Sequence, residues 1–222
     1  MRFSPVFETV ALSAALCLFA QAQITQGKDA PVNEAKGIPP RAAPAEYQAQ
    51  AAAGTVTVAA EFLGHSIPRP EGSPLITEDY VVVEIALFGP PEARLKISVD
   101  DFSVRINEKK APSPGQPFGM VFRSLKDPDW QPPVSTESKS KTGINTGGQG
   151  GQSDPPAPVH MPFTLQRAIQ QHVQKVSLPE GDRALPHAGL IFFPYRGKVE
   201  GIHSIELYYA GPAGKATLTL QP

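Results

Sequence analysis

DYVVVEIALF, residues 79–88, is the stretch that decides the fold. Val81, Val83, Ile85 and Leu87 alternate along it and form one apolar face of a β-strand. The other face is nearly as apolar, with Glu84 as its one charge. A strand that is apolar on both faces is covered on both sides, so we expect it in the centre of a sheet. A Gly-Pro-Pro turn ends it.

Shorter strands are predicted on both sides of this one. Residues 102–107 (FSVRIN) alternate apolar and polar side chains, which is typical of a half-buried strand. Residues 189–193 (GLIFF) are continuously apolar, which indicates a buried strand. The other predicted strands are residues 55–62, 95–99, 118–122, 204–209 and 215–221. Seven or so short strands with close turn signals predict a mainly β fold, a single antiparallel sandwich.

One short helix is predicted, at residues 162–176 (PFTLQRAIQQHVQKV). Leu165, Ile169, Val173 and Val176 recur at helical spacing and form a single apolar stripe. Thr164 is the predicted N-cap. The stripe favours a structural helix packed on the sheet over a helix that binds a partner.

Two segments have the composition of linkers. Residues 23–50 mix proline, alanine, glycine and charge, and we predict a disordered linker there. Residues 127–158 carry almost no apolar side chains and cannot repay the entropy of ordering, so we predict a long disordered insertion. Residues 51–222 are then one β-sandwich domain interrupted by this insertion. A boundary between two domains is the alternative, but neither half carries enough strands to bury a sandwich core.

The first residues have the pattern of a removable signal peptide. Arg2 precedes an apolar run at residues 10–20, and Ala20-Gln21-Ala22 supplies a small-x-small cleavage pattern. Residues 1–22 therefore predict export to a secreted or periplasmic location, with no stable transmembrane segment after cleavage. A buried N-terminal helix is one alternative. Lipidation at Cys17 is another, although Leu16 stands where a lipidation signal has a small residue.

Composition narrows the classes of function. The chain has 20 Lys and Arg against 21 Asp and Glu, a net charge of −1. This balance argues against nucleic-acid binding and against a polybasic membrane-surface protein. Cys17 is the only cysteine, so the mature chain has no disulfide, thiolate nucleophile or cysteine-ligated zinc.

Two blocks read together resemble a known kind of protein. They are residues 78–107, which contain EDYVVVEIALFG and DDFSVRIN, and residues 188–220, AGLIFFPYRGKVEGIHSIELYYAGPAGKATLTL. They are similar to uncharacterised exported bacterial proteins built on an immunoglobulin-like sandwich. The resemblance implies the fold and the export, and it implies no activity, because its motifs are strand-packing patterns.

No motif predicts a reaction. GPAGK at residues 211–215 has two residues between its glycines, where a phosphate-binding loop has four. GHSIP at residues 64–68 has proline in place of the second glycine of a nucleophile elbow. Asp100 and Asp101, with Glu78 and Asp79, could gather calcium, but charges at strand ends in water are the favoured interpretation. We therefore predict no catalytic, cofactor-binding or metal-binding residues and no cofactor.

Trp130 is the one candidate contact residue. It lies in a proline-rich segment, DPDWQPP, where an exposed aromatic can dock in a partner groove or fold back over a sheet edge. The function we predict is a non-enzymatic binding or structural module, with an envelope protein or a glycan as candidate partner. The alternatives are an extracytoplasmic hydrolase with a dispersed, loop-borne active site, and an accessory subunit that orders residues 127–158 on its partner.

Overall fold

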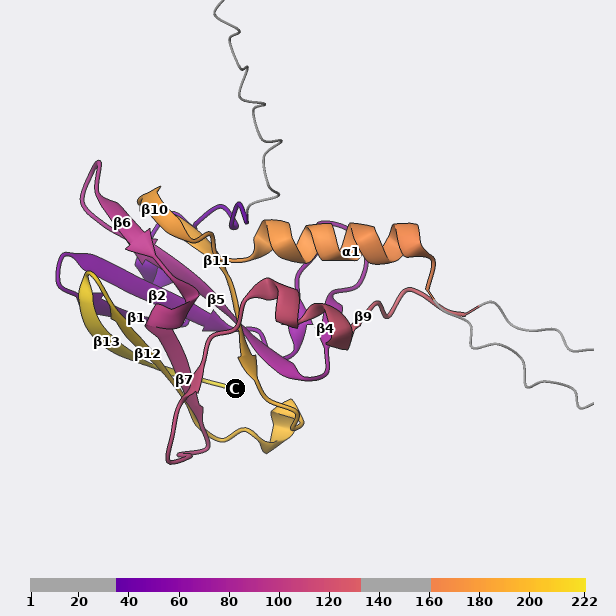
Figure 1. Ribbon diagram of the computed structural model, residues 1–222. Helices are drawn as coiled ribbons and strands as arrows, with labels where there is room; N and C mark the ends of the chain where they lie inside the picture. Colours follow the sequence, from indigo (N-terminus) through magenta and orange to yellow (C-terminus); the bar gives the residue numbers. More distant parts are fainter. Residues whose placement is uncertain (1–34, 133–160) are drawn as a thin grey trace, which may run out of the picture. The chain divides into compact units, whose positions relative to one another are not determined.

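Antiparallel β-strands are the main regular elements of the computed structural model, which describes residues 35–132 and 161–222 (Figure 1). The fold class is mainly β with one short α-helix, as predicted. The predicted signal peptide and residues 133–158 of the predicted insertion lie outside the described residues. No helix in the described ranges is long and apolar enough to cross a bilayer.

Two four-stranded antiparallel sheets form the body of the fold. The first has the order β1 (Ala49–Ala53), β2 (Val56–Phe62), β5 (Tyr80–Phe88) and β11 (His187–Pro194). The second has the order β13 (Gly214–Leu220), β12 (Ile205–Gly211), β7 (Phe102–Ile106) and β8 (Ser113–Pro114). The immunoglobulin-like strand order stays a prediction, and this arrangement is compatible with it.

Two small sheets and several short 3₁₀ turns complete the fold. One sheet pairs β6 (Arg94–Ile97) with β10 (Gly181–Ala184), and the other has the order β3 (Ser66–Ile67), β4 (Leu75–Thr77) and β9 (Leu125–Lys126). The single α-helix, α1, spans Phe163–Val176. The 3₁₀ turns are Pro44–Glu46, Val99–Asp101, Phe118–Met120, Phe122–Ser124 and Val199–Gly201.

The main core lies between the two four-stranded sheets. β5 is central, as predicted: residues 81–87 are all buried, and β5 pairs with β2 on one side and β11 on the other. The alternating apolar side chains of both sheets meet in one cluster, which includes Val58, Val83, Ile85, Ile191, Phe193, Val104, Ile205, Leu207 and Leu218. The burial pattern of β7 alternates as its sequence predicts.

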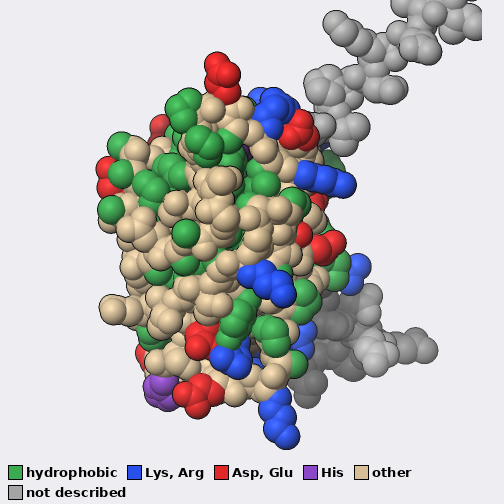
Figure 2. All heavy atoms as spheres, turned by 90° about the vertical axis from the view of Figure 1, so that its left-hand side faces the viewer, with side chains coloured by type: hydrophobic (Ala, Val, Ile, Leu, Met, Phe, Trp, Pro, Cys, Tyr) green, Lys and Arg blue, Asp and Glu red, His purple; other side chains and the backbone are tan. Residues whose placement is uncertain are grey.

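Backbone and side-chain bonds join the two sheets along both sides. Gln116, just after β8, donates its N–H to the Phe192 carbonyl oxygen on β11 at 2.8 Å. On the other side, the Gln48 side chain donates to the Gln221 carbonyl oxygen at 2.8 Å. Figure 2 looks onto the end where the β1–β2 and β12–β13 turns lie, and uncharged side chains and backbone cover most of that face.

Two expectations about local structure need correction, and a third, on residues 35–50, follows. Residues 118–122, predicted as a strand, form 3₁₀ turns, because Met120 and Val121 bond back to the carbonyls of Pro117 and Phe118. A short apolar run suits either structure, and the local bonds decide here. The helix begins at Phe163 after an extended Pro162, so Thr164 lies inside the first turn and caps nothing.

Residues 35–50 are also more ordered than their composition predicts. Tyr47 is buried, and β1 begins at Ala49 and pairs along its length with β2. The segment AQAAA has no apolar periodicity of its own, and alanine is a poor strand former. Pairing with β2, which the local sequence does not reveal, therefore determines this strand.

Candidate functional site

Helix α1 covers the outer face of the first sheet, the face that points away from the main core (Figure 1). Ile169 and Val173 are buried, as the apolar stripe predicts, and they pack with Val82 of β5 and with Leu190 and Phe192 of β11. The opposite side of the helix is polar and exposed. The helix is therefore a structural element, and its two long sides border two grooves.

The first groove, which we call the α1 groove, lies between the C-terminal half of α1 and two loops. Its volume is about 280 Å³. Apolar groups dominate its lining, and three basic side chains join them; the lining consists of Gly37, Ile38, Pro39, Pro68, Arg69, Pro70, His172, Lys175 and Val176. Ligand sites commonly combine an apolar lining with a few polar groups, and the α1 groove lies near the small end of their range of volumes.

The first loop wall is held to the helix and to β11 by backbone bonds. Lys36 donates its N–H to the Lys175 carbonyl oxygen at 3.2 Å, and Ile38 donates to the Ala188 carbonyl oxygen at 2.8 Å. Gly37 has φ +78°, and a Cβ there would lie 2.2 Å from the Ala188 carbonyl oxygen. Only glycine permits this approach, so residues 36–38 are fixed in place.

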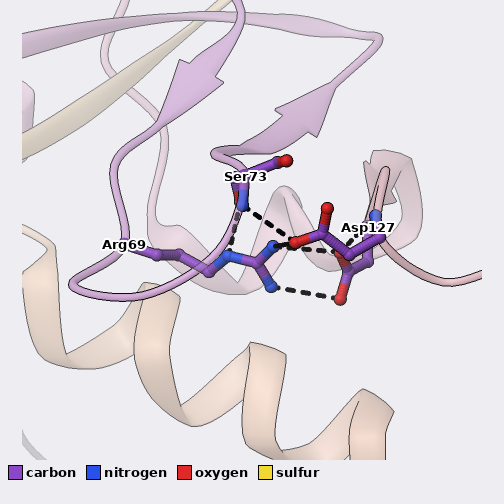
Figure 3. Close-up of polar contacts among 4 residues, drawn as sticks. Arg69, Ser73 and Asp127 are labelled. Carbon is purple, nitrogen blue, oxygen red and sulfur yellow. Dashed lines mark hydrogen bonds and ion pairs between the residues drawn. The ribbon is translucent and has the colours of Figure 1, made fainter.

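The second loop wall is held by an ion cluster around Arg69 (Figure 3). The Arg69 guanidinium donates to both carboxylate oxygens of Asp127, each at 3.1 Å, and to Asp129 Oδ2 at 2.8 Å. Its Nε donates to the Ser73 carbonyl oxygen at 2.6 Å. Hydrogen bonds from Ser73, joined by the charge of Arg69, hold the pKa of Asp129 below its ordinary range. The cluster joins loop 68–73 to residues 127–129.

His172 completes the attachment of this wall to the helix. Its Nε2 lies 2.8 Å from the Pro68 carbonyl oxygen. A carbonyl oxygen only accepts, so Nε2 carries the proton and donates. Hydrogen bonds thus join both loop walls of the α1 groove to the rest of the fold. The groove is therefore preformed.

One of the basic side chains that line the α1 groove, Lys175, differs from Arg69 in its ion pairing. Arg69 is bound by two carboxylates, whereas the exposed Lys175 pairs with no carboxylate in the described parts of the chain. An anionic group that entered the groove would meet the ammonium group of Lys175. The arrangement is therefore suited to an apolar ligand that also carries negative charge.

A second groove lies along the other side of α1, with a volume of about 240 Å³. Phe122, Leu125, Met161 and Ile169 line it together with Gln166 and Gln170. It has no charged lining. Nothing in the structure indicates what would cover it.

The residues singled out in the sequence are not brought together. Trp130 is half-buried in the turn after Asp127. Its backbone N–H donates to the Asp127 carbonyl oxygen at 3.2 Å. Asp100 and Asp101 lie in a 3₁₀ turn capped by Ser98, and burial raises the pKa of Asp101. Within residues 35–132 and 161–222, no three side chains of the metal-binding types gather around a common point.

The GHSIP motif does not form a nucleophile elbow. His65 lies in the turn before β3, and Ser66 is the first residue of that strand. The elbow requires a strand, a sharp turn and then a helix, and β3 is followed by the proline-rich loop that lines the α1 groove.

One cluster of charged side chains was not predicted from the sequence. Glu61 and Glu84 lie opposite each other on β2 and β5, and both bind the guanidinium of Arg41. That guanidinium also lies 4.4 Å from the ring centre of Tyr47. Burial, and then the charge of Glu61, raises the pKa of Glu84, while Arg41 opposes the shift. The single glutamate in an apolar strand indicates a charge that needs a partner, but that partner, Arg41, lies 43 residues away in the sequence.

Comparison with known proteins adds no assignment: no family model matches the chain, and no curated protein or solved structure gives a significant match.

Proposed function

We propose that this protein is an exported, non-enzymatic binding module whose α1 groove binds an extended, apolar and acidic peptide segment of an envelope protein. The observation that carries the proposal is the groove itself, which is preformed, lined by apolar side chains and joined by the Lys175 ammonium group, which pairs with no carboxylate among residues 35–132 and 161–222. Export rests on the pattern of residues 1–22.

The chemistry of the lining favours a peptide over a glycan. Sugars are usually bound by planar aromatic faces and dense hydrogen bonding, whereas Pro39, Pro68, Pro70, Ile38 and Val176 offer mainly aliphatic surface. An extended peptide can place apolar side chains on that surface and direct a carboxylate toward Lys175. This combination uses every feature of the groove.

The groove is tested by panning a displayed random peptide library against the purified protein. We expect the enriched peptides to combine apolar and acidic residues and to bind more weakly at high salt, because exposed charges are screened. Lys175→Glu should weaken the binding of a selected peptide about tenfold, equivalent to the loss of one favourable charge contact. Fluorescence anisotropy with the labelled peptide gives the dissociation constants.

Two further variants make the result decisive. Val176→Phe fills the groove without changing the charge, and we expect it to weaken the same peptide. Lys215→Glu makes the same charge reversal on β13, at an exposed position that does not line the groove, and should leave binding unchanged. Peptides that bind both groove variants as well as the original protein would place the site elsewhere.

The alternative is an extracytoplasmic hydrolase with a dispersed, loop-borne active site, and the paired carboxylates that the structure offers for it, Glu61 and Glu84, lie on strands. A general acid must reach its substrate and exchange a proton with it. Here one guanidinium binds both carboxylates, and neither lines either of the two grooves. The binding module is therefore the better supported of the two.

A further inference from the structure

The side chain of His65 lies between two backbone carbonyl groups from distant parts of the chain. Its Nδ1 is 2.6 Å from the carbonyl oxygen of Tyr80, at the start of β5. Its Nε2 is 2.8 Å from the carbonyl oxygen of Gly197, in the loop that leads from β11 to β12. The ring is also stacked on Tyr195, with a centroid separation of 6.1 Å and an interplanar angle of 24°.

The proton count of the ring follows from these two contacts. A carbonyl oxygen has no proton to donate, so each ring nitrogen must donate if both hydrogen bonds are made. A neutral imidazole carries one N–H and can make only one of them. The imidazolium carries two, and its positive charge also favours the face of the Tyr195 ring.

We infer that His65 is a proton-dependent clamp, which in its imidazolium form fastens the loop of residues 195–201 to the start of β5 and releases Gly197 when one proton is lost. The inference does not depend on the proposed binding function. It concerns a segment that joins the two large sheets, since this loop follows β11 of the first sheet and precedes β12 of the second.

Other contacts limit how much of the loop is released. Tyr195 donates its N–H to the Asp79 carbonyl oxygen at 2.8 Å, and Arg196 forms an ion pair with Asp79 at 2.9 Å. At the other end, the Asn107 side chain donates to the Gly201 carbonyl oxygen at 2.7 Å. The Lys198 carbonyl oxygen accepts from the Tyr195 hydroxyl at 3.3 Å and from the Gly201 N–H at 3.1 Å, so the part that depends most on His65 is the backbone at Gly197.

The surrounding charges belong to three parts of the chain. The Asp79–Arg196 ion pair adjoins both ends of the clamp, and Lys198 and Glu200 lie on the loop itself. Lys109 approaches from the segment after β7, with its Nζ 5.7 Å from the ring centre of Tyr195. None of them is a histidine, the side chain that ordinarily changes charge between about pH 5 and 8. His65 is therefore the group expected to switch the loop.

The first measurement is the ¹⁵N chemical shifts of the histidine rings in the purified protein. At about pH 5 we expect both nitrogens of His65 to be protonated and bonded, as the two contacts require. A single neutral tautomer of His65 at that pH would overturn the inference.

The second measurement is amide hydrogen exchange across residues 196–201, corrected for the intrinsic effect of pH. The Gly201 amide donates to the Lys198 carbonyl oxygen within this loop, and its protection should fall about fivefold between about pH 5 and 8, because the loop loses the hydrogen bond that holds Gly197. His65→Gln should show low protection at both pH values, since its amide cannot donate to two carbonyls that lie on opposite sides. His203→Gln changes another histidine, just before β12, and serves as the control that should keep the pH dependence. Persistence of that dependence in His65→Gln would refute the clamp.

Discussion

Glu84 lies almost fully buried on the outer face of β5, and its environment explains why an acid is tolerated there. Its side chain is 11% exposed, and Arg41 reaches over the sheet to bind it together with Glu61. Burial raises the pKa of Glu84 above its ordinary value even with Arg41 present. The folded state therefore holds its proton to a higher pH than the unfolded chain does, so this group favours folding in acid. The contribution is lost as pH rises through the folded-state pKa.

Removal of the guanidinium should enlarge this effect. Arg41→Met leaves two adjacent carboxylates without a counter-charge, and we expect a loss of about 2 kcal/mol in the free energy of unfolding near neutral pH. The loss should become smaller at low pH, where both carboxylates carry protons and only the contacts of Arg41 with Tyr47 and the Glu46 carbonyl oxygen are removed. Urea unfolding followed by circular dichroism at the two pH values measures it. Arg94→Met, which breaks the exposed ion pair with Asp182, is the matched control and should cost at most about 1 kcal/mol at either pH. Equal losses for the two variants would contradict the role given to Arg41.

At the scale of single elements, helix α1 is attached to the sheet by a narrow stripe. Val173 is fully buried and Ile169 nearly so, whereas Phe163 at the start of the helix is 75% exposed. A hydrophobic side chain contributes to stability in proportion to the apolar area that it removes from water. The middle of the helix, and not its aromatic first residue, therefore holds it in place.

Truncation of that stripe gives a direct test. Val173→Ala should lower the free energy of unfolding by about 2 kcal/mol, because it removes buried methyl groups and leaves a cavity. Gln171→Ala on the exposed side should change it by less than about 0.5 kcal/mol. Thermal and urea denaturation provide both values. A cost for Gln171→Ala as large as that for Val173→Ala would show that α1 packs through another face.

At the scale of the whole molecule, the two parts of the described chain are interleaved. β5 from the first part pairs with β11 from the second, and β7 pairs with β12 in the other large sheet. Neither part could complete either large sheet alone. We therefore expect the two parts to fold as one unit.

Cutting the chain between these parts tests their interdependence. A specific protease site placed within residues 133–160 should yield two fragments that elute together in gel filtration and separate only in denaturant. Each fragment expressed alone should fail to fold, because each lacks pairing partners for its central strands. Fragments that separate under native conditions would indicate two independent domains.

The predicted export is also tested on the whole molecule. When the full chain is produced in a bacterium, we expect the exported form to begin at Gln23 and to have the unmodified mass of residues 23–222. Ala22→Arg should block this processing, because the cleavage pattern needs a small residue there. Cys17→Ser should not affect it. A mature form that begins at an acylated Cys17 would instead establish the lipidation alternative.

Much of the fold is determined by the sequence alone. Alternation in residues 102–107, the doubly apolar run of residues 79–88 and the stripe of α1 identify elements that the structure contains. These signals are local, because the period of a strand or helix directly sets which side chains share a face. The two errors have different causes: residues 118–122 form local 3₁₀ bonds that a short apolar run does not reveal, and β1 depends on pairing with β2.

Only the tertiary structure determined the candidate site. Arg69 and Asp127 are 58 residues apart, and His65 and Gly197 are 132 apart, so no spacing motif could connect them. The α1 groove likewise joins segments around residues 38, 69 and 175 that meet only because β2, β5 and β11 pair side by side. Periodicity reports which face of an element is buried. Which distant side chains meet there depends on chain topology, and pairing between strands decides that.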